Sequence, residues 1–282
     1  MNIFLQTLSL MLALAVSISH QTMTTTVNPK HNDPFLYGMY DTMDECDPPE
    51  GDGLMFSCEQ RLEPVYVVEV GQPLQLSCSV SGSREANIEW RHNGKVIVSM
   101  TGSNKERRPF LRTDVLHHNI NCATPKDNGN YECIARSNNV VIRKTTTVFV
   151  IVSDDESNEK TISNCMEKRK ANVPAKIYAS TDTLFDAPGS QARLTCRASG
   201  SPRPEIRWSV RTNTEDFKPI TSENNEFKMT PRGDLILPSL SLEPVHFAEY
   251  KCEVSNAAGS DSASTYLQVV SSFYFFLFWQ KK

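Results

Sequence analysis

The strongest constraint on this chain is an internal repeat built on cysteine, tryptophan and tyrosine. In the first copy, Cys78 is followed 12 positions later by Trp90, and the copy ends at Tyr131-x-Cys133. The second copy has the same order, displaced by 118 or 119 positions: Cys196, Trp208 and Tyr250-x-Cys252. Two homologous domains in tandem explain this match far better than chance does.

Within each copy the apolar residues follow the period of a β-strand. They occupy every second position in residues 74–80 and again in residues 206–210. Such alternation indicates strands that turn one face to a core and the other to water. Short turn sequences rich in glycine, proline and asparagine separate these strands, for example Asn93-Gly94. The sequence therefore predicts an all-β chain.

The repeated frame resembles the immunoglobulin fold, in which two cysteines bridge two sheets and a tryptophan packs on the bridge. In the first copy, Asp127-x-Gly129-x-Tyr131-x-Cys133 is similar to the tyrosine corner of that fold. In the second copy, residues 200–208 and Cys252-x3-Asn256-x2-Gly259 resemble the intermediate set. The resemblance covers about residues 63–270. It implies two tandem immunoglobulin-like β-sandwich domains.

The same resemblance implies roles for particular side chains. The bridging cysteines would be Cys78 with Cys133 and Cys196 with Cys252. The core aromatics would be Trp90, Tyr131, Trp208 and Tyr250. The sequence also departs from the family pattern: His246 replaces the aspartate of the second corner, and Asn138 lacks the glycine that follows Asn256. We therefore expect an unusual hairpin around Asn138.

The segments outside the two domains differ from them in composition. Residues 1–19 hold no charged side chain and are mostly apolar, which is typical of a secretory signal peptide. The other segments are an acidic arm at 20–62, domain 1 at 63–152, a charged linker at 153–172, domain 2 at 173–270 and an aromatic tail at 271–282. The tail is too short to cross a bilayer, so we expect a secreted protein without a membrane span.

Four cysteines remain outside the repeat: Cys46, Cys58, Cys122 and Cys165. In a secreted chain they are candidates for two further disulfides, and three pairings are open. Cys122 lies where strand E of an immunoglobulin domain leaves the sandwich, and the linker that carries Cys165 starts from the same end. This placement favours Cys122–Cys165 and leaves Cys46–Cys58. The spacings of these cysteines match no zinc site.

Charge and motif content exclude several classes of function. The net charge of −4 argues against a general nucleic-acid binder. The six histidines form no nucleophile or metal motif, and His118 is expected to turn towards the core of its strand. We therefore expect no enzyme activity, no metal and no cofactor. The absence of an Asn-x-Ser/Thr site for N-glycans leaves the sheet faces free for protein contacts.

Two turns offer candidate binding residues. Arg232, Gly233 and Asp234 form an integrin-type tripeptide at an expected turn, although a glycine at this place also suits the turn alone. Asn138, Asn139 and Val140 lie in the expected hairpin between strands F and G of domain 1. Binding residues are common on such loops.

A signal peptide followed by two immunoglobulin domains resembles the zwei-Ig family, small secreted proteins of nematodes that hold axons and cell bodies in place. The resemblance implies a secreted adhesion protein whose partner is a neuronal or other cell-surface protein. A similar architecture occurs in a secreted insect protein that sequesters insulin-like peptides, so a soluble hormone binder is the alternative. Its apolar groove would draw on residues 65–68 and the aromatic tail. Assembly of the chain with itself is a third option.

Overall fold

The computed structural model describes residues 53–57, 62–83, 85–102, 110–152, 157–168, 172–212, 216–221, 227–241 and 247–270. The expected signal peptide, the aromatic tail, most of the acidic arm and the pair Cys46 and Cys58 lie outside these residues. Residues Glu45–Lys282, which hold both repeats, form one compact unit. Each repeat builds a β-sandwich, so the all-β class with two tandem sandwich domains is confirmed.

Domain 1 packs two sheets face to face. One sheet has the order β1 (Leu54–Phe56), β3 (Leu74–Gly82) and β6 (Leu111–Ile120). The other has the order β2 (Val65–Glu69), β8 (Val140–Ile151), β7 (Gly129–Ser137), β4 (Asn87–His92) and β5 (Lys95–Met100). Domain 1 begins before the predicted boundary at residue 63, because β1 pairs with β3 inside what composition marked as the arm.

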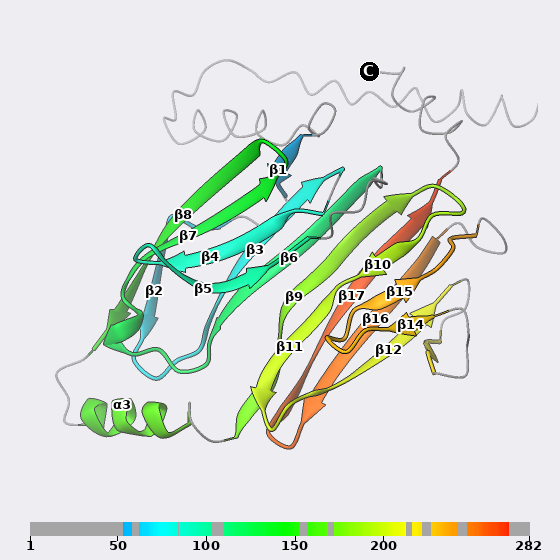
Figure 1. Cartoon of the computed structure of the whole chain (residues 1–282). Coiled ribbons are helices and arrows are strands. Elements are labelled where there is room, and N and C mark those ends of the chain that lie inside the picture. Colours follow the sequence, from blue (N-terminus) through cyan, green and yellow to red (C-terminus); the bar gives the residue numbers. More distant parts are fainter. Residues whose placement is uncertain are drawn as a thin grey trace, which may run out of the picture. The chain divides into compact units, whose positions relative to one another are not determined.

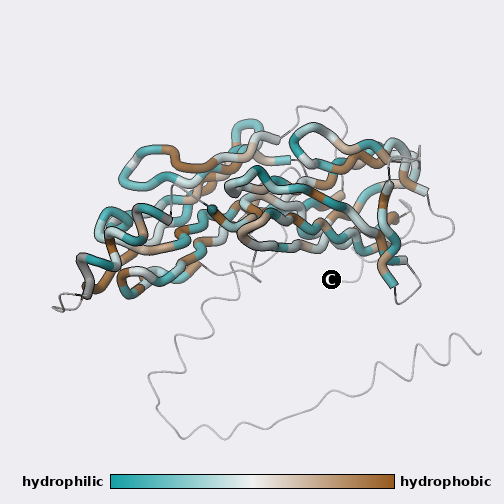
Figure 2. The backbone as a smooth tube through the Cα atoms, turned by 90° about the horizontal axis from the view of Figure 1, so that it is seen from below, coloured by the Kyte–Doolittle hydropathy of each residue, from teal (hydrophilic) through white to brown (hydrophobic). Residues whose placement is uncertain are grey.

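Domain 2 repeats the arrangement with a divided second strand. One sheet contains β9 (Val173–Asp186), β17 (Gly259–Val269), β16 (Phe247–Asn256), β12 (Glu205–Arg211) and β13 (Lys218–Pro219), with β11 (Cys196–Ser201) paired to β9. The opposite sheet contains β10 (Ala192–Leu194), β15 (Leu235–Leu237) and β14 (Lys228–Met229). More and less buried positions alternate along much of β8, as the period of two predicts, and apolar and polar residues are intermixed along the tube in Figure 2.

Each sandwich closes over a disulfide and a buried tryptophan. The bridges are Cys78–Cys133 in domain 1 and Cys196–Cys252 in domain 2. The two tryptophans, Trp90 and Trp208, are 0% and 3% exposed in the two cores. Each indole N–H donates to a backbone carbonyl oxygen, at 2.9 and 2.8 Å respectively. The polar atom of each tryptophan is therefore satisfied inside its core.

The tyrosine corner of domain 1 joins a core side chain to a surface turn. Tyr131 is 1% exposed, and its hydroxyl donates to the carbonyl oxygen of Asp127 at 3.0 Å. The Asp127 carboxylate accepts from the backbone N–H and the hydroxyl of Thr124, both at 2.8 Å. These bonds hold the short helix η2 (Pro125–Asp127) in front of β7. In domain 2 the corresponding Tyr250 is 8% exposed.

The two domains share one sheet, because β6 of domain 1 pairs with β9 of domain 2. Six residue pairs, from Leu111 with Phe185 to Leu116 with Ala179, make the sheet continuous over nine strands (Figure 1). We call this pairing the seam. No described residue of domain 1 forms the strand D that would border strand E in an immunoglobulin sandwich. β9 of domain 2 takes its place.

A buried polar network fills the core side of the seam. Arg112 is 3% exposed and donates from Nε to Asp114 at 2.6 Å, and from Nη2 to the hydroxyls of Thr181 (2.6 Å) and Thr195 (3.1 Å). Thr181 in turn donates to Asp114 at 2.9 Å. Burial lowers the pKa of Arg112, but the charges of Asp114 and Glu85 outweigh burial and raise the pKa above its ordinary value. The guanidinium therefore stays charged between the two domains.

The predicted linker contains a helix that its composition did not indicate, α3 (Ser157–Lys168). A disulfide joins Cys165 of this helix to Cys122, two residues past the end of β6, and this is the pairing that the sequence favours. The helix also lies against the turn before β3, where a Cβ added to Gly71 would come within 2.7 Å of Cγ2 of Thr161. The linker is thus fastened to domain 1 before it enters domain 2.

Replacing Cys122 and Cys165 together by serine should lower the free energy of unfolding. The bond spans 43 residues, and the chain-entropy model gives about 4 kcal/mol as the upper value for such a loop. Urea denaturation of the full chain measures the change. Unchanged stability would contradict the pairing, and so would a tryptic peptide from the unreduced protein that joins Cys46 to either cysteine.

Replacing Arg112 by methionine should destabilise the protein by about 3–5 kcal/mol, because the Asp114 carboxylate then stays buried without its cation. The matched control is Arg207→Met, since the side chains of the Arg207–Glu205 pair are 71% and 63% exposed. Such surface pairs contribute about 0–1 kcal/mol. Equal losses of unfolding free energy in the two variants would show that the network adds nothing to the seam.

Candidate binding surfaces

The exposed apolar side chains of the described residues gather on domain 1. Of twelve large apolar side chains that are exposed, nine belong to β2, β5 or β8 or directly follow β8. These nine are Val65, Val67, Val96, Ile97, Val140, Val141, Phe149, Ile151 and Val152. The three in domain 2 are Met229, Phe247 and Tyr266. The five-stranded sheet of domain 1 therefore exposes more large apolar side chains to a partner than the described part of domain 2 does.

Four of these side chains form a contiguous group at one edge of the five-stranded sheet. β2 pairs with β8 in parallel, with Val67 opposite Phe149. Val65, Val67, Phe149 and Ile151 are 49–62% exposed, because each lies on the side of its strand that turns away from the core. The alternate residues at this end of β8 are apolar as well and are buried, so the strand end is apolar on both faces. We call the four side chains the apolar edge.

Paired charges cover the middle of the same face. Glu89 accepts from Arg136 Nη1 at 2.8 Å and from Arg91 Nε at 2.9 Å, and Arg143 lies 3.4 Å from Glu132. Burial raises the pKa of Glu89, but the hydrogen bonds and charges of Arg136 and Arg91 outweigh burial and lower the pKa below its ordinary value. On β8, Thr145 and Thr147 lie between these charged pairs and the apolar edge, so the face changes from apolar through uncharged polar to charged, as from the centre to the rim of a protein interface.

The hairpin between β7 and β8 holds the loop residues that the sequence singled out. Ser137 pairs with Val140, so Asn138 and Asn139 form a two-residue turn in which Asn138 has a φ of +50°. Asparagine tolerates this left-handed conformation, which explains how the turn forms without glycine. Asn138, Asn139 and Val140 are all exposed. They lie at the start of β8, whereas the apolar edge lies at its end, so the structure does not bring the two together.

A second apolar group crosses the outer side of the seam. The register places Leu111 opposite Phe185, Phe185 opposite Gln268, and Gln268 opposite Phe247, so one row of side chains runs over both domains. Tyr266 stacks on Phe247 with ring centroids 6.1 Å apart, and the two side chains are 43% and 48% exposed. We call Leu111, Phe185, Phe247 and Tyr266 the seam surface.

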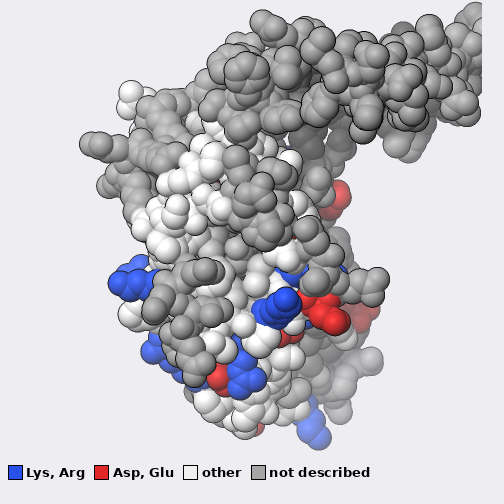
Figure 3. Space-filling view, turned by 90° about the vertical axis from the view of Figure 1, so that its right-hand side faces the viewer, with Lys and Arg blue, Asp and Glu red and all other residues white. Residues whose placement is uncertain are grey.

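The polar border of the seam surface is an ion pair on domain 2. Glu249 lies opposite Tyr266 in the sheet, pairs with Arg211 and accepts from the hydroxyl of Ser264 at 2.7 Å. Burial raises the pKa of Glu249, but the hydrogen bonds of Ser264 and Arg211 outweigh it and lower the pKa. Arg211 also lies 4.7 Å from the ring centre of Phe217. Seen from the side that Figure 3 shows, most of the coloured charged side chains lie in the lower half of the view.

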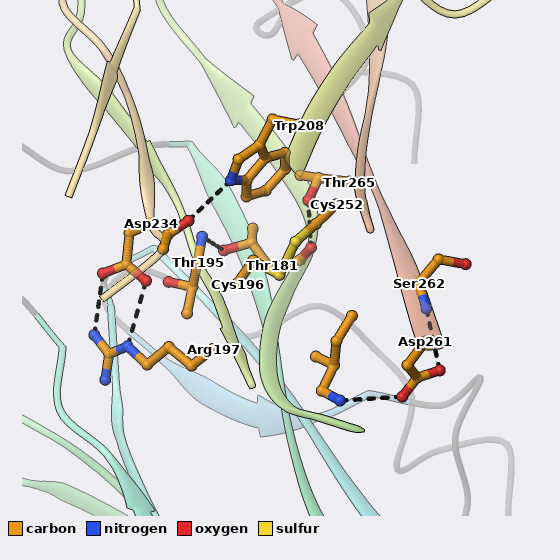
Figure 4. Close-up of a disulfide and its surroundings, with 12 residues drawn as sticks. Thr181, Thr195, Cys196, Arg197, Trp208, Asp234, Cys252, Asp261, Ser262 and Thr265 are labelled. Carbon is orange, nitrogen blue, oxygen red and sulfur yellow. Dashed lines mark hydrogen bonds and ion pairs between the residues drawn. A yellow bond between two sulfur atoms is a disulfide. The ribbon is translucent and has the colours of Figure 1, made fainter. Parts of the chain in front are cut away.

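The interpretation of Arg232-Gly233-Asp234 as an integrin-type site is wrong. Asp234 is 3% exposed, and its carboxylate accepts from Nε and Nη2 of Arg197 at 3.3 and 3.2 Å (Figure 4). Gly233 has a φ of +100°, and its carbonyl oxygen accepts the indole hydrogen bond of Trp208. Of the three residues only Arg232 is exposed. The turn therefore serves the core of domain 2, and its aspartate is not available to a receptor.

The described residues contain no group of three histidine, cysteine, aspartate or glutamate side chains that could hold a metal ion. His118 faces the core as its register predicts, with its ring 5.6 Å from that of Tyr131. His117 points the other way and lies 2.8 Å from the hydroxyl of Ser77. Among the described helices, none is long and apolar enough to cross a membrane.

The sequence analysis identified part of the apolar edge and no part of the seam surface. It marked residues 65–68 as an apolar strand, and two of these residues belong to the apolar edge. The run of apolar residues on both faces of β8 is the signal that could have located the other two members, Phe149 and Ile151. The seam surface has no local signal, because its four residues come from four strands of two domains.

Comparison with known proteins agrees with this architecture. Residues 52–137 match the model of an immunoglobulin domain, and residues 177–269 match that of the immunoglobulin I-set domain. The neural ectodermal development factor IMP-L2, whose crystal structure is known, aligns over 79% of this chain and 97% of its own with a TM-score of 0.59 and 22% identity. That likeness concerns the fold.

Three relatives with known names differ widely in how much of them the chain covers. Human hemicentin-1 is 28% identical over 72% of this chain, which spans 3% of hemicentin-1. The zwei Ig domain protein zig-4 of Caenorhabditis elegans is 24% identical over 70% of this chain and 73% of its own length. The human cell adhesion molecule DSCAML1 is 25% identical over 71% of this chain, which spans 9% of DSCAML1. The chain is a tandem of two immunoglobulin domains, of which the second is an I-set domain.

Proposed function

We propose that this chain is a secreted, non-enzymatic adhesion protein that binds proteins on neuronal or other cell surfaces and helps to keep axons and cell bodies in position. The observation that carries the proposal is the apolar edge of domain 1, on a face that also carries paired charges. Likeness to a zwei Ig domain protein and to a cell adhesion molecule supports a protein partner outside the cell. The absence of an N-glycan site in the sequence keeps this face open to such a partner.

The apolar edge has the properties of an interface centre. Its four side chains are neighbours on two paired strands, so one partner can cover all of them at once. Removing a large apolar side chain from water contributes about 1.5–3 kcal/mol when its burial is complete. In protein interfaces a few such residues dominate the affinity, and aromatic residues are prominent among them. Phe149 is the aromatic member of the apolar edge, and we infer that it contributes most.

Replacing Phe149 by glutamate should weaken binding to neuronal cells by about tenfold or more, because a charge then occupies the centre of the contact. The measurement uses the full chain, secreted as a multivalent fusion to raise avidity, on cells and on a panel of neuronal ectodomains. The control is Met229→Glu, since Met229 is 54% exposed on domain 2 and lies outside both surfaces. Equal binding of the two variants would overturn the assignment of the face.

The second candidate function is sequestration of a small soluble hormone such as an insulin-like peptide. The seam surface favours it, because its one aliphatic and three aromatic side chains cross both domains, and the stacked rings of Phe247 and Tyr266 are exposed. An amphipathic helix can lay its apolar face on such a row. A soluble binder of this kind lowers the free hormone concentration by mass action and requires no receptor.

If the chain binds a soluble hormone, Tyr266→Ser should weaken binding of an insulin-like peptide by about tenfold, and Phe149→Glu should leave it unchanged. Fluorescence anisotropy with a labelled insulin-like peptide measures both. Binding to membrane ectodomains alone would refute hormone sequestration, and binding to the peptide alone would refute cell-surface adhesion. Sedimentation of the free chain at several concentrations detects self-association, which would compete with either partner.

A further inference from the structure

One histidine lies at the end of the seam, where the backbone pairing between the domains stops. The ladder of β6 and β9 ends at Leu116 with Ala179. One residue further along β6, the Nδ1 atom of His117 is 2.8 Å from the hydroxyl of Ser77 on β3. Two residues beyond, the side chain of Asn119 makes one more contact with domain 2. His117 therefore lies between the last backbone pair and the last side-chain contact.

The contacts beyond the ladder meet at one residue of domain 2. Asn119 Nδ2 donates to the carbonyl oxygen of Ile177 at 3.1 Å. The backbone N–H of Ile177 donates to the carboxylate of Asp261 on β17 at 3.0 Å, and Lys176 lies 3.8 Å from the same carboxylate. A change at His117 is therefore close to the hydrogen bonds by which Ile177 of β9 contacts Asn119 and Asp261.

Among the described residues, the charge that acts on His117 comes from domain 2: it is the carboxylate of Asp261 on β17. β3 contributes the uncharged hydroxyl of Ser77. The single carboxylate is already shared by the N–H of Ile177 and the ammonium group of Lys176. A proton added to His117 thus puts a positive charge in a partly buried place where Asp261, the carboxylate that acts on it among the described residues, is engaged elsewhere.

Burial lowers the pKa of His117, and the charge of Asp261 raises it by less, so the pKa lies below its ordinary value of 6.5. At a pH above 6.5 the imidazole is neutral in both the folded and the unfolded chain, so it does not change the free energy of unfolding. As the pH falls from 6.5 towards the lower folded pKa, the unfolded chain binds the proton first. Acidification therefore favours opening of the structure around His117, and below the folded pKa the loss is complete.

We propose that His117 makes the seam sensitive to pH, so that acidification from neutral pH to about pH 5.5 loosens the pairing of the two domains. A ligand that binds across the seam surface would be released by the same change, because its contacts come from both domains. This consequence for a ligand rests on the hormone-binding function proposed above. The loosening of the seam does not.

Hydrogen exchange of the full secreted chain at pH 7.4 and pH 5.5 tests the proposal, with protection corrected for the intrinsic exchange rate at each pH. We expect protection to fall at pH 5.5 in the paired segments of β6 and β9. Protection in β4 and β7 of domain 1, which lie away from the seam, should change less. Equal protection of the seam at both pH values would overturn the proposal.

Variants separate His117 from other titrating groups. In His117→Gln the side-chain amide can still bond to Ser77 but takes up no proton, so the response to pH should be lost. In His118→Gln, a neighbour that faces the core instead, the response should remain. A response that persists in His117→Gln would contradict the role of this residue.

A second measurement does not depend on the folding of the glutamine variant. In Asp261→Asn the charge that raises the pKa of His117 is removed, so the His117 imidazole should titrate at a lower pH than in the parent chain, as read by NMR. An unchanged titration would overturn the proposed contact. If the seam loosens at pH 5.5 and a bound insulin-like peptide stays in place, the hormone-binding site is refuted and the pH-sensitive seam stands.

Discussion

The backbone hydrogen bonds between β6 and β9 decide how the two immunoglobulin domains relate to each other. Domains joined by a linker alone are expected to move, because few contacts cross their boundary. Here six residue pairs, a buried arginine and a disulfide-anchored helix connect them. Leu111 and Phe185 belong to different domains and are neighbours only because of this pairing. The seam surface therefore exists as one surface only while the sheet is continuous.

The buried network adds specificity to this pairing more than it adds strength. Moving the charges of Arg112 and Asp114 out of water is costly, and their attraction offsets the cost only when the remaining hydrogen bonds are also made. Domain 2 supplies these bonds through the hydroxyls of Thr181 and Thr195. A shift of β9 by one residue would turn Thr181 to the other face of the sheet. The network thus selects one register among those that the backbone alone would allow.

Sequence patterns predicted what is local to each domain and the Cys122–Cys165 bond of the linker, but they missed the strand pairing that joins the domains. The spacing of cysteine, tryptophan and tyrosine was enough for two sandwiches, because it reports how one strand packs over another within each core. Alternation in β6 indicates a strand with two faces but does not indicate which strand lies beside it. Asp234 was misread for a related reason: its turn looks exposed in sequence, but the partner that buries it is Arg197, 37 residues earlier. Both features depend on long-range contacts that no local pattern encodes.

The edge position of β6 among the described strands of domain 1 also sets the order in which the chain can finish folding. Domain 1 is synthesised first, and domains generally fold in that order. Until β9 has been made, β6 is an open edge, and Arg112 and Asp114 lack the hydroxyl groups that satisfy them. Open strand edges are sites of wrong pairing between chains. During synthesis the first domain is therefore complete only after the second has been made, and a chain truncated before residue 173 would leave the edge of β6 open to pairing with other chains.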